Sequence, residues 1–251
     1  MSKPRIRYKN SPLKEVIFQL RFPTILSINA NEPVEFQEKI RAEYPLYRNV
    51  EEPKRVESKD GKEIVVETTR KYEFISADGL HKVTLASSFI AFSTLGYNVW
   101  EEFKKNIEQV VRKFQSIYKP PFYVRIGLRY KDVISKTQYT TLSGKRWSEL
   151  VKPEVIGIIS NIDENDAQEY QMMSLYKQAS DHSMVRNQFG FVYLEGEETL
   201  SLLLDCDYFQ TELTSLDKML TVAESLHEHS RNFIDNSITP ALREAMQPEE
   251  I

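Results

Sequence analysis

The feature that most constrains the fold is a strand pattern followed by a long helix pattern near the end of the chain. From Thr199 to Tyr208, apolar residues alternate with mostly polar ones, the two-residue period of a strand with one buried face. From Ser215 to about Asn236, apolar side chains recur every three or four residues, which predicts an amphipathic helix. The apolar positions of this helix include Leu216, Met219, Leu220, Ala223, Leu226 and Phe233. Because such a helix must bury its apolar face, the pair predicts a helix packed on a sheet.

The first half of the chain has a comparable order of patterns. Alternation over Glu15–Phe22 predicts a strand, and a short helix is expected between Asn31 and Tyr44. Several antiparallel strands should follow, the first two joined by an Asp-Gly turn within Ser58–Lys62. An apolar stripe from Trp100 to Ile117 then predicts a long helix, which Pro120 and Pro121 terminate.

The second half repeats that order. Phe122–Ile134 is expected to be a long strand, followed by a short helix near Trp147. Strands are then expected at Tyr170–Gln178, Met184–Tyr193 and Leu200–Tyr208, before the long helix. No residue identity links the halves, so an internal duplication rests on the order of elements alone.

We therefore predict an α+β protein with an N-terminal tail at residues 1–13, similar halves at residues 14–118 and 122–246, and a C-terminal tail at residues 247–251. The two halves should form one compact unit. If the duplication is real, two antiparallel sheets would join edge to edge into one curved sheet with the long helices on its convex face. That is the architecture of TATA-binding-protein-like folds, and it would leave a concave face open to a ligand or partner.

Composition excludes several classes of protein. A chain of 251 residues can bury a core without covalent cross-links, and its one cysteine, Cys206, excludes an intramolecular disulfide. Because Cys206 falls on the apolar side of its strand, we expect it to be inert core. No apolar run approaches the roughly 20 residues that span a bilayer, and no signal-peptide core follows Met1, so we expect a cytoplasmic protein without membrane contact. The net charge of −4 argues against broad nucleic-acid binding but allows a local basic patch.

Short segments resemble a known family. They are Asn10–Phe22, Arg125–Tyr130, and Leu204–Tyr208 followed by Leu226-His227-Glu228. They resemble a sporadically distributed prokaryotic family of proteins of about this length, which has no assigned activity. Patchy distribution implies genes exchanged with mobile elements, as defence components and toxin-neutralising proteins are. The resemblance implies no catalytic residue.

One candidate ligand site is a basic strip on the long middle strand. Its residues are Tyr123, Arg125, Arg129 and Lys131, which alternate with apolar positions. Arginine offers a planar fork to phosphate and tyrosine a stacking surface, so the strip is a candidate site for a nucleotide or nucleic acid. The alternative is that these side chains pair with acids on a neighbouring strand.

One candidate metal site consists of Asp205 and Asp207, which lie two residues apart and so project from the same strand face. Hard cations such as Mg²⁺ prefer closely spaced carboxylates. No third acidic ligand is tied to them by spacing, and pairing with arginine is the structural alternative.

No recognisable catalytic motif occurs. The chain has no glycine-rich phosphate loop, Gly-x-Ser-x-Gly elbow or His-Glu-x-x-His sequence, and its four histidines form no motif. We therefore predict no catalytic residue and no cofactor. The leading hypothesis is a non-enzymatic binding protein, with a partner protein or a second copy of the chain as its target. The alternatives are a nucleotide or nucleic-acid binder that uses the basic strip, and a metal-dependent hydrolase.

Overall fold

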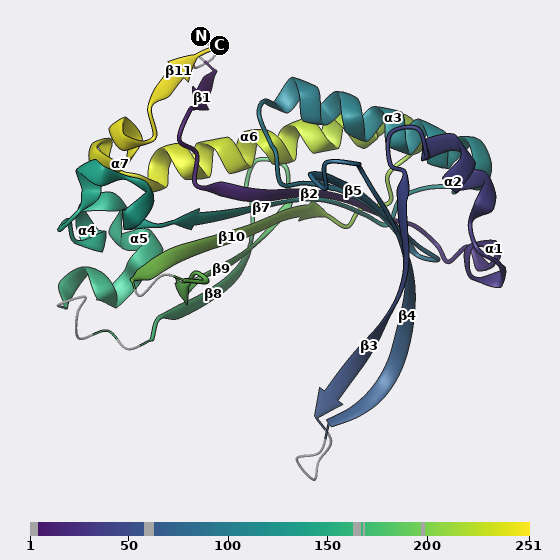
Figure 1. Cartoon of the computed structure of the whole chain (residues 1–251), viewed down its shortest axis with the longest axis horizontal. Helices are drawn as coiled ribbons and strands as arrows, with labels where there is room; N and C mark the ends of the chain where they lie inside the picture. Colours follow the sequence, from purple (N-terminus) through teal and green to yellow (C-terminus); the bar gives the residue numbers. More distant parts are fainter. Residues whose placement is uncertain (1–4, 58–62, 163–166, 168, 197–198) are drawn as a thin grey trace.

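The protein is a mixed α+β molecule built on one large antiparallel sheet (Figure 1). The computed structural model describes residues 5–57, 63–162, 167, 169–196 and 199–251. The Asp-Gly turn expected within residues 58–62 lies outside the described residues.

Nine strands form the sheet in the order β3-β4-β5-β6-β2-β7-β10-β9-β8. All of the pairings are antiparallel. The strands are β2 (Leu13–Arg21), β3 (Leu46–Glu57), β4 (Glu63–Ile75), β5 (His81–Ala86), β6 (Phe89–Thr94), β7 (Arg125–Ile134), β8 (Gln171–Lys177), β9 (Met184–Tyr193) and β10 (Leu200–Gln210). Strands β2 and β7 are neighbours near the centre, so β3 to β6 extend from one side of this pair and β8 to β10 from the other.

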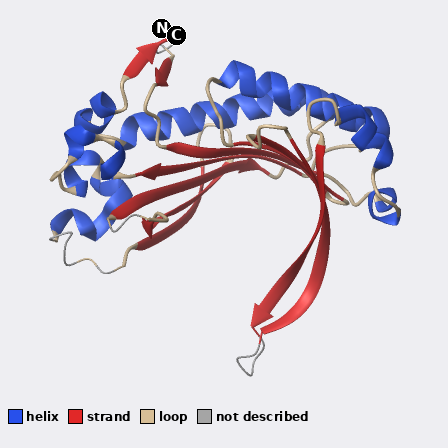
Figure 2. Ribbon diagram, viewed as in Figure 1, coloured by secondary structure: helices blue, strands red, loops and turns tan. Residues whose placement is uncertain are grey.

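Two long helices, α3 (Trp100–Tyr118) and α6 (Met219–Ser237), cover one face of the sheet (Figure 2). Shorter helices lie at the two ends: α1 (Leu26–Ala30) and α2 (Val34–Ile40) at one, and α4 (Trp147–Leu150), α5 (Pro153–Ile156) and α7 (Pro240–Ala245) at the other. The sheet bends away from the long helices, so they lie on its convex side. None of the described helices covers the opposite, concave face, which we call the open face.

The core lies between the sheet and the long helices, as strand periodicity requires. Val16, Phe18 and Leu20 of β2 are buried beside Ile126 and Leu128 of β7. The buried side chains of the long helices include Phe103, Ile107, Val110 and Phe114 of α3, and Met219, Ala223 and Leu226 of α6. Cys206 belongs to this core, and burial raises the pKa of its thiol. Alternation therefore separates each central strand into a core face and an open face.

The segments predicted to be tails contribute a further element. Strands β1 (Ile6–Tyr8) and β11 (Pro248–Glu250) pair antiparallel, with Ile6 opposite Glu250. The Arg7 guanidinium donates to Glu249 at 2.6 Å. These residues form a two-stranded ribbon because their backbone groups satisfy one another, a pairing between distant segments that local sequence does not signal.

No described helix combines the length and the apolar character that crossing a membrane requires. The long helices each keep a polar side toward solvent. Their burial follows the three- and four-residue spacing predicted for a helix packed on a sheet.

The core assignment predicts unequal costs for the same substitution at two sites. Leu128 is 0% exposed on the core side of β7, whereas Leu175 of β8 is 54% exposed. Leu128→Ala should lower the free energy of unfolding by about 2–5 kcal/mol, because it removes buried contacts and leaves a cavity. Leu175→Ala should change it by less than about 0.5 kcal/mol. Urea unfolding measures both; equal losses would contradict the assignment.

Candidate functional site

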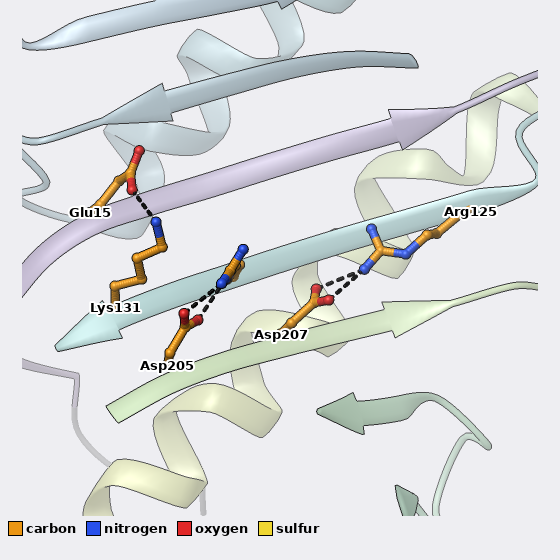
Figure 3. Close-up of polar contacts among 6 residues, drawn as sticks. Glu15, Arg125, Lys131, Asp205 and Asp207 are labelled. Atoms are coloured by element: carbon orange, nitrogen blue, oxygen red, sulfur yellow. Dashed lines mark hydrogen bonds and ion pairs between the residues drawn. The ribbon is translucent and has the colours of Figure 1, made fainter. Parts of the chain in front are cut away.

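The open face carries the predicted basic residues of β7. Because side chains alternate along a strand, Arg125, Arg129 and Lys131 project away from the core that Ile126 and Leu128 enter. All three reach acidic side chains of the neighbouring strands β2 and β10 (Figure 3). The structure therefore brings the predicted basic strip and the predicted acidic pair together.

Arg125 lies flat on the sheet. Its Nη2 donates to both carboxylate oxygens of Asp207, at 2.7 and 2.8 Å. Its Nη1 donates to Oε1 of Gln19 at 3.1 Å, and its Cζ lies 4.5 Å from the centroid of the Phe209 ring. The guanidinium thus joins β2, β7 and β10 across the open face.

Gly127 makes this position of Arg125 possible. A Cβ atom built at Gly127 would lie 2.1 Å from Nη1 of Arg125, far inside van der Waals contact. The guanidinium therefore occupies the space that any side chain at position 127 would need. Glycine at position 127 lets the Arg125 guanidinium approach the backbone closely. The backbone of Gly127 itself has the conformation of an ordinary strand residue.

Arg129 makes the second two-point contact. Its Nε donates to Oδ1 of Asp205 at 2.6 Å and its Nη2 to Oδ2 at 2.5 Å. In the strand register Arg129 lies opposite Asp207 and Lys131 opposite Asp205, so Arg129 reaches diagonally to Asp205. Arg125 reaches Asp207 from farther along β7, across Gly127. Lys131 Nζ instead contacts Oε2 of Glu15 on β2 at 2.7 Å (Figure 3).

The two arginines have different surroundings. Burial lowers the pKa of Arg125, and the adjacent Asp207 carboxylate opposes that effect. Hydrogen bonding to Asp205 raises the pKa of Arg129, which is more exposed. Both guanidinium groups stay charged near neutral pH. Their charges are largely neutralised by fixed carboxylates, so the pairs hold the side chains in place.

Tyr123 does not belong to the strip. The predicted alternation extends back from Arg125 to Tyr123, but β7 begins only at Arg125, and the strand parity does not apply before it. Tyr123 is fully buried, and its hydroxyl accepts a hydrogen bond of 2.8 Å from Nε2 of Gln115 on α3. Burial raises the pKa of Tyr123 to about 12. Its role here is packing.

The predicted acidic pair has the partners that the structural alternative proposed. Asp205 and Asp207 each bind an arginine with both carboxylate oxygens. Among the residues that the structure describes, no group of three or more histidine, cysteine, aspartate or glutamate side chains is placed to hold a metal ion. A metal at these aspartates would first have to displace the arginines.

Further residues of the open face were not predicted. Gln19 and Glu15 of β2 and Phe209 of β10 contact the strip, and Arg186 of β9 lies 6.0 Å from the Phe209 ring. The alternation along β2 and β10 indicates which face of the sheet these residues occupy. Alternation does not indicate which strands are neighbours, so the contacts between these residues could not be predicted from it.

The open face is basic although the chain is acidic. By strand parity and register, its described basic residues are Arg21, Arg48, Lys71, Lys82, Arg125, Arg129, Lys131, Lys177 and Arg186. Its described acidic residues, Glu15, Glu52, Glu73, Asp205 and Asp207, are fewer. Strand β8 adds the exposed apolar side chains of Met173 and Leu175 to the same face. The face therefore combines positive charge with apolar surface.

No protein-family model matches the chain, and no curated protein matches it.

The position of Arg125 over Gly127 yields a test. Gly127→Ala should lower the free energy of unfolding by about 1–3 kcal/mol, because the new methyl group displaces the guanidinium from Asp207 and Gln19. In an Arg125→Ala background, where the space is free, the same substitution should cost much less. A double-mutant cycle by urea unfolding measures the difference. Equal costs in both backgrounds would show that the guanidinium does not restrict position 127.

Proposed function

We propose that this chain is a non-enzymatic binding protein whose open face takes an acidic segment of a partner protein. The observation that carries the proposal is the excess of basic side chains on an uncovered, concave sheet face in a chain of net charge −4. Complementary charge guides association and selects partners. Exposed apolar residues at one edge of the face, Met173 and Leu175, would add contact area.

The fixed side chains of the open face favour binding. Arg125 and Arg129 are already held by two-point contacts, and Phe209 packs beneath Arg125. Binding costs less conformational entropy when the side chains that the partner contacts are already ordered, because they are not immobilised on docking. The paired arginines provide the frame, whereas the exposed Arg21 and Arg186 remain available to the partner's carboxylates.

We also propose a cellular role for this binding. The resemblance to a sporadically distributed prokaryotic family favours a cytoplasmic accessory of defence or toxin neutralisation. A second copy of the chain is the other target that fits a concave, charged face. Native mass spectrometry of the purified protein separates the two targets, because a homo-oligomer needs no foreign partner.

Arg186 offers the sharpest test of the leading proposal. Arg186→Glu reverses a charge at an exposed position of the open face, whereas Lys105→Glu makes the same change at an exposed position of α3 on the opposite side. Affinity capture from source-cell extract, with and without nuclease, should recover a protein with the wild type and Lys105→Glu. Arg186→Glu should recover about tenfold less, since the charge reversal repels an acidic segment.

The outcome that contradicts this proposal is equally specific. A partner that Arg186→Glu retains, or that both variants lose to the same extent, does not use the open face. If nuclease treatment abolishes recovery, the open face binds a nucleic acid, which is the alternative hypothesis.

That alternative is favoured by the exposed arginines of the open face. Arg21 and Arg186 suit phosphates, although Phe209 lies beneath Arg125 and offers little free stacking surface. If a nucleic acid binds, fluorescence anisotropy with a labelled single-stranded oligonucleotide should show affinity falling linearly with salt on logarithmic axes, and Arg186→Glu should reduce that slope by about 1. Lys105→Glu is the control. Affinity that does not respond to salt would exclude this mode.

We also infer that the two halves, residues 14–118 and 122–246, derive from a duplication and form a TATA-binding-protein-like unit. The central antiparallel pair of β2 and β7, with a meander and a long helix after each strand, supports the inference. An experimental structure in which β2 superposes on β7 and β6 on β10 would bear it out. Halves that superpose only with another strand order would contradict it.

A further inference from the structure

A second site lies on the helix side of the sheet, away from the open face. It is a pocket of about 150 Å³ between β1, the chain before α3, the strand β7 and helix α6. Its residues include Tyr97, Trp100, Tyr130, Asp132, His227 and Ser230. The pocket combines aromatic walls with one buried acid.

Asp132 is that buried acid. It is 7% exposed and shares the core side of β7 with Tyr130, two residues before it. No described residue makes a hydrogen bond or ion pair with its carboxylate, and burial raises its pKa to about 7. A buried carboxylate without a partner is costly, so the position favours a group that supplies either a positive charge or a hydrogen-bond donor.

The aromatic walls are held in place by contacts among themselves. The imidazole of His227 stacks on Trp100, with ring centroids 4.3 Å apart, and its Nδ1 lies 2.8 Å from the Tyr130 hydroxyl. Tyr97 packs edge-on against Tyr130 at 6.2 Å. Burial lowers the pKa of His227 to about 4, so it is neutral at physiological pH. Aromatic faces of this kind attract cations and apolar groups alike.

The other charged side chains at the pocket contact groups of opposite charge, although Nε of Arg7 is buried without a hydrogen-bond partner. Arg7 contacts Glu249 at 2.6 Å, and Arg5 contacts Glu101. On α6 and its neighbour, Arg231 contacts Glu228 at 3.5 Å and Asp235 contacts Arg243 at 2.8 Å. Each of these arginines therefore has an acidic partner. Asp132, in contrast, has no cationic partner among the described residues.

We propose that this pocket binds a small primary or methylated amine with an apolar body. The ammonium group would contact the Asp132 carboxylate, and the apolar body would lie against Tyr97, Trp100 and Tyr130. An ammonium ion serves both features at once, because a desolvated carboxylate and aromatic faces each favour a cation. An anionic ligand would leave Asp132 without a partner and add a repulsive charge. The pocket lies on the side of the sheet opposite the open face, so failure of one proposal would leave the other unaffected.

The test compares three probes of one size and different charge. They are 2-phenylethylamine, the neutral 2-phenylethanol and the anionic phenylacetate, with binding to the full chain followed by ligand-observed NMR. The amine should bind saturably and at least about tenfold more tightly than the alcohol, and phenylacetate should not compete with it. Asp132→Asn should weaken the amine by about tenfold or more, because it keeps the shape and removes the charge. Asp217→Asn, at an exposed position outside the pocket, should leave amine binding unchanged.

A second variant keeps the test decisive if Asp132→Asn alters the fold. Ser230 of α6 lines the pocket and is buried, so Ser230→Leu should fill part of the space and displace the amine while Asp132 stays in place. Far-UV circular dichroism and a melting curve check the fold of each variant. The proposal is overturned if wild type shows no saturable amine binding, if a folded Asp132→Asn binds the amine as wild type does, or if phenylacetate binds more tightly than the amine.

Discussion

The antiparallel pairing of β2 with β7 is the interaction on which the rest of the structure depends. It places Phe18 beside Leu128 under the long helices, and in the same register it places Glu15 beside Lys131 on the open face. A slip of one residue would turn charges into the core and apolar side chains out to solvent. The register is therefore set by burial on one face, and the charged contacts of the other face follow from it.

The charged pairs of the open face contribute order more than stability. Removing arginine and aspartate from water costs free energy, which two-point hydrogen bonding largely offsets. The result is a set of mutually bonded side chains at the centre of the sheet, with Arg125 held between Asp207, Gln19 and Phe209. A surface of this kind suits recognition of a charged partner, because its geometry exists before the partner arrives.

The two faces of the sheet differ in whether their aspartates have a cationic partner. Asp205 and Asp207 each meet an arginine, whereas Asp132, one strand away on the other face, meets no described cation. Leu204 lies opposite Asp132 in the register of β10 and Leu13 in that of β2, so its nearest cross-strand neighbours cannot satisfy a carboxylate. Packing around Tyr130 and His227 leaves space beside Asp132 in place of a partner.

Local periodicity was enough to predict much of the fold. It predicted the long helix near Ser215–Asn236, observed as α6 at Met219–Ser237 after a short 3₁₀ turn, and the strand that precedes it, observed as β10 at Leu200–Gln210. Burial of an apolar stripe leaves a clear period in the sequence, so these elements are recoverable. The same reasoning failed for Tyr123, because periodicity does not show where a strand begins.

The sequence by itself determined the types of the long elements and the core face of each central strand. It also placed Arg125, Arg129 and Lys131 on one face of their strand, and Asp205 and Asp207 on one face of theirs. It left open whether those sets bind a ligand, a metal or each other. Only the tertiary structure decided that Arg125 pairs with Asp207 and Arg129 with Asp205, that β1 pairs with β11, and that Asp132 stands alone beside an aromatic pocket. The physical reason is that strand neighbours and register are long-range properties, set by packing of the whole core, whereas periodicity records only which side of an element is buried.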